Sequence, residues 1–314
     1  MQTVMGIENF HDKSKPIYLA LGNFDGVHKG HQSLIQALIR KAKVNGGQAL
    51  AFIFEPHPAQ VLMPERAPRL LQTPQGKADL LEKIGLDLLI YNPFTSEIAA
   101  WSPEQFVEKI LIGVLQISEV FIGFNYTFGH RGAGTPDYLK QLGDKLGFGV
   151  NIIAPVTYEG EPISSSLVRK ALEVGDILTA YNMLGYHPVI EGVVVEGEHR
   201  GAQIGFPTAN VGVETMYNIP GKGVYAAHAW IGSKVYHGVV NIGSKPTFHQ
   251  EYPLSIEAHL IDFTGDIYGQ NIRLSFLEKL REEQRFQSLE ELVSQIARDR
   301  DRAEEICRAY DGDL

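Results

Sequence analysis

Two histidines stand three residues apart in the stretch LGNFDGVHKGHQ (21–32). Imidazoles at positions i and i+3 project from the same side of a helix, so His28 and His31 could act together. They could bind a metal, cap the helix or donate hydrogen bonds to a phosphate. Neither a cysteine nor a third ligand at fixed spacing accompanies the pair to support zinc. Glycines frame the pair after an apolar run, which favours phosphate handling. These glycines are Gly22, Gly26 and Gly30.

A strand and a helix must position these histidines. Residues 17–22 (IYLALG) form an apolar run typical of a buried strand, and residues 31–44 carry apolar side chains at the spacing of one helix face. The stretch between them is then a strand–turn–helix corner with its histidines at the start of the helix. Free N–H groups and the positive end of the helix dipole meet there, so the corner suits an anion.

Strand-like and helix-like runs alternate up to about residue 155, which predicts a parallel sheet with helices on both faces. Further strands are expected at 48–54, 87–93, 118–124 and 148–155, and further helices around 103–115 and 135–146. Ligands of such sheets gather at the carboxyl ends of the strands. FEPHP (54–58) and GFNYTFGH (123–130) directly follow strands, so both could meet the histidine corner at that edge.

Short strands with glycine-rich turns replace this rhythm after residue 188. Their alternation of polar and apolar residues predicts a small antiparallel barrel or sandwich. The expected strands are VIEGVVVEGE, GVYAAHAWIG, KVYHGVVNIG, SIEAHLIDF and NIRLSFLEKLR, and residues 289–310 return to helical spacing. We place the boundary near LGYHP (184–188), which predicts one domain over residues 1–185 and another over residues 186–314.

The composition excludes several classes of protein. The chain has 314 residues, a length that suits two domains. Its formal net charge of −9 argues against nucleic-acid binding through an extended positively charged surface. Its one cysteine, Cys307, excludes an internal disulfide and is expected to be a partly buried helix residue. The N-terminal residues lack the apolar segment of a signal peptide, and no apolar run is long enough to span a membrane. These features predict a cytoplasmic protein without a membrane partner.

Together, these motifs resemble those of the bacterial bifunctional riboflavin kinase/FAD synthetases, in the order typical of that family. The N-terminal half resembles the adenylyltransferase module through LGNFDGVHKGH, FEPHP, GFNYTFG and ISSSLVR (163–169). The C-terminal half resembles the kinase module through RGAQIGFPTANV (200–211), GVYA (223–226), NIGSKPTF (241–248) and EAHLIDF (257–263). The resemblance implies a Rossmann-like nucleotidyltransferase domain followed by a β-barrel kinase domain with a terminal helix. It also implies two reactions: phosphorylation of riboflavin to FMN by ATP, and adenylylation of FMN to FAD with release of pyrophosphate.

The resemblance assigns residues to adenylyl transfer. His28 and His31 match the HxGH signature, whose histidines donate hydrogen bonds to charge building up at the α-phosphate. Arg169 would steady the leaving pyrophosphate beside the hydroxyls of Ser164 and Ser165. The substrate-binding residues that the resemblance implies here are Gly22, Phe24, Asp25, Gly26, Phe54, Pro56, His57, Pro58, Asn125 and Phe128.

The chain departs from the family pattern at a few positions of this module. Glu55 stands where the family usually has aspartate, and ISSSLVR replaces the usual STxxR with S-L-V-R. The carboxylate and a hydroxyl survive both changes. RGAGT follows GFNYTFGH where an acidic residue often closes the motif, which leaves the contacts of Arg131 open.

The kinase half has no Walker A sequence, because IPGKGVYA lacks the spacing and the following Ser or Thr. Thr208 and Asn210 face the same side of an extended segment and offer oxygen donors suited to Mg²⁺, although a turn is the alternative interpretation. The resemblance assigns both to Mg²⁺–nucleotide. It assigns Glu257 as the base that accepts the hydroxyl proton. Without the resemblance, the alternating pattern around Glu257 also fits a half-buried strand whose polar face is exposed to solvent.

The resemblance implies roles for two further residues of the kinase half. Gly205 would shape the nucleotide loop, and Arg281 would contact flavin or phosphate.

Two other functions are alternatives to this interpretation. A class I aminoacyl-tRNA synthetase also carries HxGH and a serine-rich basic motif, but this acidic chain lacks a basic RNA-reading domain. A non-catalytic flavin-binding protein is the second rival, and the presence of the catalytic residue types argues against it. We expect small-molecule substrates, no nucleic-acid partner, and a monomer or weak homo-oligomer.

Overall fold

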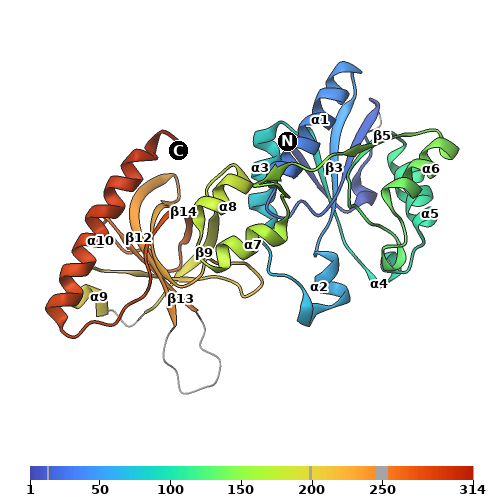
Figure 1. The fold of residues 1–314 in the computed structure, drawn as a ribbon. Coiled ribbons are helices and arrows are strands. Elements are labelled where there is room, and N and C mark those ends of the chain that lie inside the picture. Colours follow the sequence, from blue (N-terminus) through green and yellow to red (C-terminus); the bar gives the residue numbers. More distant parts are fainter. Residues whose placement is uncertain (13, 198–199, 245–253, 314) are drawn as a thin grey trace. The chain divides into compact units, whose positions relative to one another are not determined.

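The computed structural model describes residues 1–12, 14–197, 200–244 and 254–313. Its chain divides into two compact units (Figure 1). The first comprises residues 1–68 and 73–164, and the second comprises residues 69–72 and 165–314. The second unit therefore includes the helices α7 (Ser165–Glu173) and α8 (Ile177–Leu184). The boundary after residue 185 stays a prediction about where the two functional domains meet.

Six parallel strands form the sheet of the first unit, in the order β1-β4-β3-β2-β5-β6. They are β1 (Gln2–Met5), β2 (Ile17–Leu21), β3 (Gln48–Phe54), β4 (Leu88–Asn92), β5 (Ile117–Gly123) and β6 (Gly149–Ile153). The predicted parallel sheet is confirmed, and β1 is an addition to it. Because β3, β2 and β5 are neighbours, the three motifs that follow these strands share one edge of the sheet, as expected.

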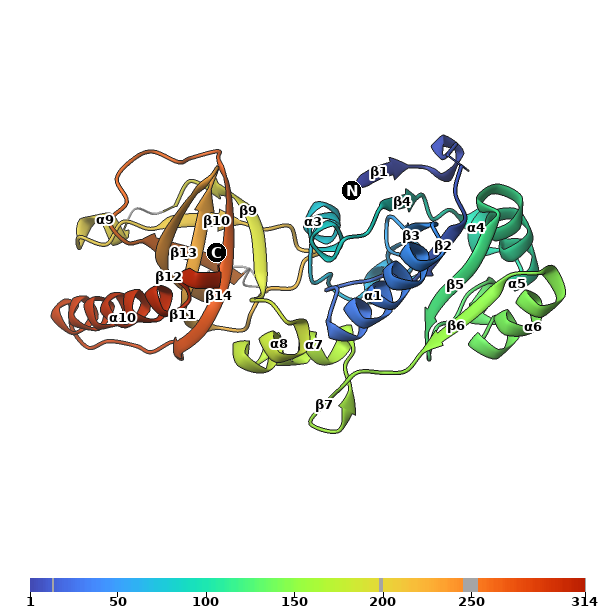
Figure 2. The ribbon, with the colours of Figure 1, turned by 90° about the horizontal axis from the view of Figure 1, so that it is seen from above.

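Helices cover both faces of this sheet (Figure 2). One face packs against α1 (Lys29–Val44) and α3 (Pro74–Ile84) through Ile35, Leu38 and Leu81. The other packs against α5 (Pro103–Phe106), the π-helix η3 (Val107–Leu115) and α6 (Pro136–Leu146). Burial on both faces explains why the strands read as uninterrupted apolar runs. This unit also contains the helices α2 (Pro58–Leu62) and α4 (Ser96–Ala99). Short elements are η1 (Ile7–Asn9), η2 (Pro64–Arg66), η4 (His130–Gly132), β7 (Thr157–Tyr158) and β8 (Glu161–Pro162).

The second unit is built on a closed antiparallel barrel with strand order β10-β13-β12-β11-β14-β9, which confirms the predicted barrel. Its strands are β9 (Val189–Val195), β10 (Ala209–Gly212), β11 (Gly223–Ile231), β12 (Lys234–Ser244), β13 (Leu254–Leu260) and β14 (Asn271–Arg281). Its remaining elements are α9 (Arg200–Gln203), α10 (Leu289–Ala309) and η5 (Asp311–Asp313).

Helix α10 packs on the outside of the barrel. Ile306 and Cys307 bury against Val224 and Val239, so these two barrel residues mark the outer face of their strands. Cys307 is fully buried rather than partly buried, at 0% exposure, because the helix end presses it onto the strands. Across the described ranges, no helix has both the length and the apolar composition needed to cross a membrane.

Candidate active sites

The histidine corner joins β2 to α1. His28 is the residue before the helix, and its Nδ1 accepts a hydrogen bond from the backbone N–H of His31 at 3.4 Å. The two rings stack with centroids 3.6 Å apart and an interplanar angle of 17°. Nδ1 of His31 is buried, and the described residues supply no hydrogen-bond partner for it. His28 thus caps the helix, while His31 keeps a polar atom that a ligand could satisfy.

Burial keeps both imidazoles neutral at neutral pH. It lowers the pKa of His28 to about 4, and it holds the pKa of His31 well below its ordinary value with help from neighbouring His28 and Lys77. A neutral imidazole has one N–H donor and one acceptor nitrogen. The corner therefore offers hydrogen bonds to an anion without carrying a permanent charge of its own.

Lys77 of α3 supplies that charge, and it was not among the residues predicted from the sequence. Its side chain is buried, and Nζ donates a hydrogen bond to the carbonyl oxygen of Asn23 at 2.9 Å. Burial lowers the pKa of Lys77, while Asp25 and Glu55 raise it. Burial also raises the pKa of Glu55, against the opposing effect of Lys77. A lysine one turn before Leu81 on the buried face of a helix was the available signal.

The loop between β2 and the histidines is held in an uncommon conformation. Phe24 and Val27 have φ of 47° and 33°, in the left-handed region that non-glycine residues rarely adopt. Both side chains are buried, so packing fixes the loop. A Cβ at Gly22 would lie 3.0 Å from the ring of buried Phe24, so a larger residue there would press on this ring.

The segment after β3 holds four of the predicted flavin-binding residues. Phe54 is half-buried and packs edge-on against Phe94, with ring centroids 5.0 Å apart. His57 precedes α2, where its Nδ1 accepts a hydrogen bond from the N–H of Ala59 at 3.1 Å. Pro56 and Pro58 flank it, the first through a cis peptide bond. His57 therefore has a capping role, and flavin contact by these four residues stays a prediction.

The segment after β5 presents a different aromatic residue from the predicted one. Phe128 is only 7% exposed and lies in the core beside Phe106 and Tyr126. Phe124, next to the exposed Asn125, is 44% exposed at the carboxyl end of β5. Flavin contact by Asn125 and Phe128 stays a prediction, and Phe124 becomes an additional candidate. An aromatic residue directly after a strand was the signal for it.

The ISSSLVR segment straddles the division between the two units. Its first residue lies near the histidine corner, because a Cβ at Gly30 would be 3.9 Å from the carbonyl oxygen of Ile163. Ser164 ends the first unit, and Ser165 begins α7 in the second. Arg169 of α7 donates from Nε to the carbonyl oxygen of Arg69 at 2.6 Å. The pyrophosphate role of Arg169 and the two serines stays a prediction.

A row of polar residues crosses three strands of the barrel. Asn210 on β10 pairs in register with Glu257 on β13, and Glu257 pairs with Asn241 on β12. All three are half-buried, and Asn241 pairs with Val224, so the row lies on the outer face. Asn241 was not predicted as a site residue, although it is the first residue of the motif NIGSKPTF (241–248). Residues 245–248 of that motif lie outside the described residues.

Close contacts with glycine position the beginning of this row. A Cβ at Gly197 would lie 1.9 Å from Nδ2 of Asn210, so only glycine leaves room for the amide. Thr208, two residues before Asn210, lies near Gly201, where a Cβ would be 3.4 Å from its Oγ1. Asn210 and Thr208, the two predicted oxygen donors, thus lie against the backbone at Gly197 and Gly201, respectively.

A cavity of about 490 Å³ opens beside the row. Nδ1 of His259 donates to the carbonyl oxygen of Pro207 at 2.8 Å, which joins the GFPT segment to β13 two residues beyond Glu257. The volume lies in the usual range for sites that bind a small molecule. Its lining is Gly205, Phe206, Pro207, His259, Leu260, Ile261, Asp262, Phe263, Arg300 and Glu304. Of these, Gly205 alone was predicted as a binding residue.

Arg281 is engaged in a structural ion pair. Its Nε donates to Oδ1 of Asp299 in α10 at 3.2 Å and to Oδ2 at 2.9 Å, and its Nη2 donates to Oδ2 at 2.7 Å. Asp299 is only 5% exposed. This bidentate pair fastens the end of β14 to the helix. A flavin or phosphate contact by Arg281 stays a prediction.

Comparisons with known proteins agree with this division of sites. The FAD synthetase family model matches residues 10–167, and the riboflavin kinase family model matches residues 184–307. The Bacillus subtilis protein named bifunctional riboflavin kinase/FMN adenylyltransferase is 39% identical, over 91% of this chain and 90% of its own. The Escherichia coli K12 protein of the same name is 35% identical, over 95% and 96%.

A solved structure extends the likeness to the fold. A Streptococcus pneumoniae chain, titled a macrolide-efflux protein, superposes with a TM-score of 0.87 at 28% identity and covers 97% of this chain and 99% of its own. The efflux name applies to that protein. The predicted family is confirmed: the chain belongs to the bifunctional riboflavin kinase/FMN adenylyltransferases, with an N-terminal FAD synthetase domain and a C-terminal riboflavin kinase domain.

Proposed function

We propose that FMN is adenylylated at the histidine corner and that riboflavin is phosphorylated beside the row of Asn210, Glu257 and Asn241. The observation that carries the proposal is the register pair of Asn210 and Glu257, which brings a metal-ligand type and a candidate base together on one face. The buried, unpartnered Nδ1 of His31 supports the corresponding assignment in the first unit.

In adenylyl transfer, a phosphate oxygen of FMN attacks the α-phosphorus of ATP while the bond to the β-phosphate oxygen breaks. His28 and His31 donate hydrogen bonds to the negative charge that develops on the α-phosphate. Lys77 adds a fixed positive charge close to the corner and holds the loop through Asn23. Arg169, with Ser164 and Ser165, steadies the departing pyrophosphate. The protein contributes position and electrostatics, and no covalent enzyme intermediate forms.

In riboflavin phosphorylation, the ribityl 5′-hydroxyl attacks the γ-phosphorus of ATP and ADP leaves. Glu257 accepts the hydroxyl proton, which requires hydrogen-bond reach of the substrate oxygen. The cavity beside His259 and Pro207 receives the nucleotide, and Gly205, with φ of 88°, forms the turn at its rim. The row of Asn210, Glu257 and Asn241 then faces the phosphates of the bound nucleotide.

The donor set of the kinase site fits Mg²⁺. Thr208 and Asn210 offer a hydroxyl and an amide oxygen, the hard donors that Mg²⁺ accepts alongside water and nucleotide phosphates. These two residues would hold the ion together with the nucleotide. When bound, Mg²⁺ neutralises phosphate charge during transfer. Glu257 remains the group that takes the proton.

The test is a time course of purified protein with riboflavin and Mg²⁺–ATP, followed by chromatography of the flavins. FMN that rises and then gives way to FAD supports both assignments. FMN without FAD would remove the adenylyltransferase assignment and direct attention to Glu55 and RGAGT. No product from riboflavin, but FAD from added FMN, would remove the kinase assignment. A tRNA aminoacylation assay tests the rival enzyme class.

We also propose that the chain acts in the cytoplasm, because both reactions consume ATP, and that it is a monomer or weak homo-oligomer. Fractionation of cells and light scattering over a range of protein concentrations test these two proposals. A stable oligomer at the lowest concentration would contradict the second.

A further inference from the structure

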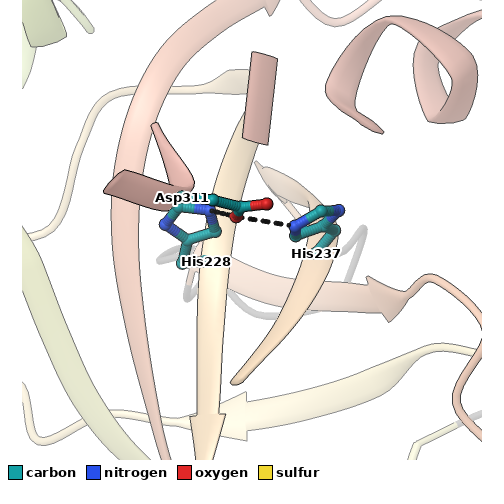
Figure 3. A group of neighbouring side chains, drawn as sticks. All are labelled: His228, His237 and Asp311. Atoms are coloured by element: carbon teal, nitrogen blue, oxygen red, sulfur yellow. Dashed lines mark hydrogen bonds and ion pairs between the residues drawn. The ribbon is translucent and has the colours of Figure 1, made fainter. Parts of the chain in front are cut away.

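His228, His237 and Asp311 form a cluster that neither proposed reaction uses. The cluster meets β12 at His237, whereas the row of Asn210, Glu257 and Asn241 crosses β12 at Asn241. His228 on β11 and His237 on β12 are register partners, and Asp311 of η5 lies over both (Figure 3). Oδ1 of Asp311 is 3.3 Å from Nε2 of His228 and 3.0 Å from Nε2 of His237. These three ligand atoms all lie within 4.8 Å of one another. Three separate elements thus converge on one point.

The spacing of these atoms suits a tetrahedral metal. Zn²⁺ binds imidazole nitrogen and carboxylate oxygen at about 2.0–2.2 Å, so neighbouring ligand atoms in a tetrahedron are about 3.3 Å apart. Both measured separations from Asp311 are already close to that value. The side chain of Asp311 is 46% exposed in a short terminal turn, so it can adjust, whereas His228 is 2% exposed and fixed.

We propose that His228, His237 and Asp311 form a zinc-binding site that fastens the end of α10 to the barrel. Each imidazole would give its Nε2 lone pair to the ion and keep its proton on Nδ1, and water would complete four-coordination. Without the ion, Nε2 of His228 also lies 3.1 Å from the carbonyl oxygen of Cys307, so metal binding would replace that hydrogen bond. His237 precedes Asn241 by four residues on the same strand, about 13 Å along it. The site is therefore distinct from the catalytic row, and its role is structural.

Zinc binding is tested on the full-length protein after treatment with EDTA and removal of the chelator. Zn²⁺ is titrated in competition with a chromophoric chelator, and bound metal is counted by atomic emission after dialysis. His237→Gln and Asp311→Asn change partly exposed side chains, so both variants are expected to fold. His11→Gln removes an exposed histidine of the first unit and serves as the matched control.

We expect one bound Zn²⁺ per chain in the wild type and in His11→Gln, and at least about tenfold weaker binding in the two site variants. Co²⁺ bound to the wild type should show the strong visible absorption of a tetrahedral site, and this should vanish in Asp311→Asn. Riboflavin phosphorylation should persist in both variants.

The competing account is a metal-free contact in which the Nε2–H groups of both histidines share one carboxylate oxygen of Asp311, while that of His228 also donates to the carbonyl oxygen of Cys307. It predicts that Asp311→Asn lowers the thermal stability equally with and without Zn²⁺, while zinc binding is absent or unchanged. Either result overturns the proposal. Equal zinc binding by wild type and both site variants would likewise overturn it, because the metal would then lie elsewhere.

Discussion

Glu257 lies between two asparagines, with Asn210 opposite it on β10 and Asn241 opposite it on β12. Directly paired side chains on neighbouring strands stand about 5 Å apart at Cβ, so the three polar groups form one continuous band. The neighbours of Glu257 along β13, Ile256 and Ala258, are buried on the other face. The barrel thus places the carboxylate among amide groups and keeps it at a surface that substrate can reach.

Replacing Glu257 by glutamine should stop one reaction and spare the other. The amide keeps the shape of the side chain but cannot accept the hydroxyl proton, so riboflavin phosphorylation should fall about a hundredfold or more. FAD formation from added FMN should stay within twofold of the wild type. Chromatography with each flavin supplied separately measures both rates. Glu278→Gln, on the exposed side of β14, is the control, and a Glu257→Gln rate near that of the control contradicts the assignment.

Replacing Gly197 by alanine should displace Asn210. The new Cβ would lie 1.9 Å from Nδ2, so the amide must move, and a misplacement of about 1 Å can cost about a hundredfold in rate. We expect a loss of riboflavin phosphorylation and a need for more Mg²⁺, with FAD formation unchanged. Gly312→Ala is the control because its Cβ would meet nothing within 4 Å. If the Mg²⁺ dependence of Gly197→Ala matches the wild type, Asn210 does not hold the metal.

Replacing Lys77 by methionine should impair FAD formation. Methionine fills a similar volume but removes the charge near the corner and the hydrogen bond to Asn23. FMN adenylylation should fall at least tenfold, with a raised KM for ATP, while riboflavin phosphorylation persists. Lys83→Met, exposed on the same helix, is the control. A variant with normal KM and kcat but lower stability would make Lys77 a purely structural residue.

The elements were predictable where the local pattern is strong. The run of buried residues in β2 and the amphipathic spacing of α1 fix the histidine corner from a short stretch of chain. Strand β1 was missed because only Val4 is buried in it, which leaves no periodic signal. Cys307 was expected to be half-buried because helical spacing does not say how closely α10 presses on the barrel.

The sites were less predictable because distant segments complete them. Lys77 reads as an ordinary helix lysine until its contact with Asn23, 54 residues earlier, is known. Asn210 and Glu257 are 47 residues apart, and only the barrel's strand order makes them neighbours. Their residue types were informative, whereas their grouping depended on tertiary structure.

Acid should destabilise the first unit through His28. Its pKa is about 4 in the folded protein because of burial, and an unfolded histidine has a pKa near 6.5. The unfolded state therefore binds more protons below pH 6.5, so stability falls as pH decreases from about 6.5 to about 4 and is fully present above that window. Between pH 7.5 and pH 5, His28 alone should cost about 2 kcal/mol of unfolding free energy.

Urea unfolding measures this loss, and the chain's two tryptophans allow the units to be followed separately. In a Trp230→Phe background, the fluorescence of Trp101 reports on the first unit. His28→Gln in that background should lose about 2 kcal/mol less than its parent between the two pH values, because glutamine does not titrate. His130→Gln, which removes an exposed histidine of the same unit, should keep the parent's pH dependence. Equal pH dependence in His28→Gln and its parent would mean that His28 is protonated in the folded protein and that burial does not keep the corner neutral.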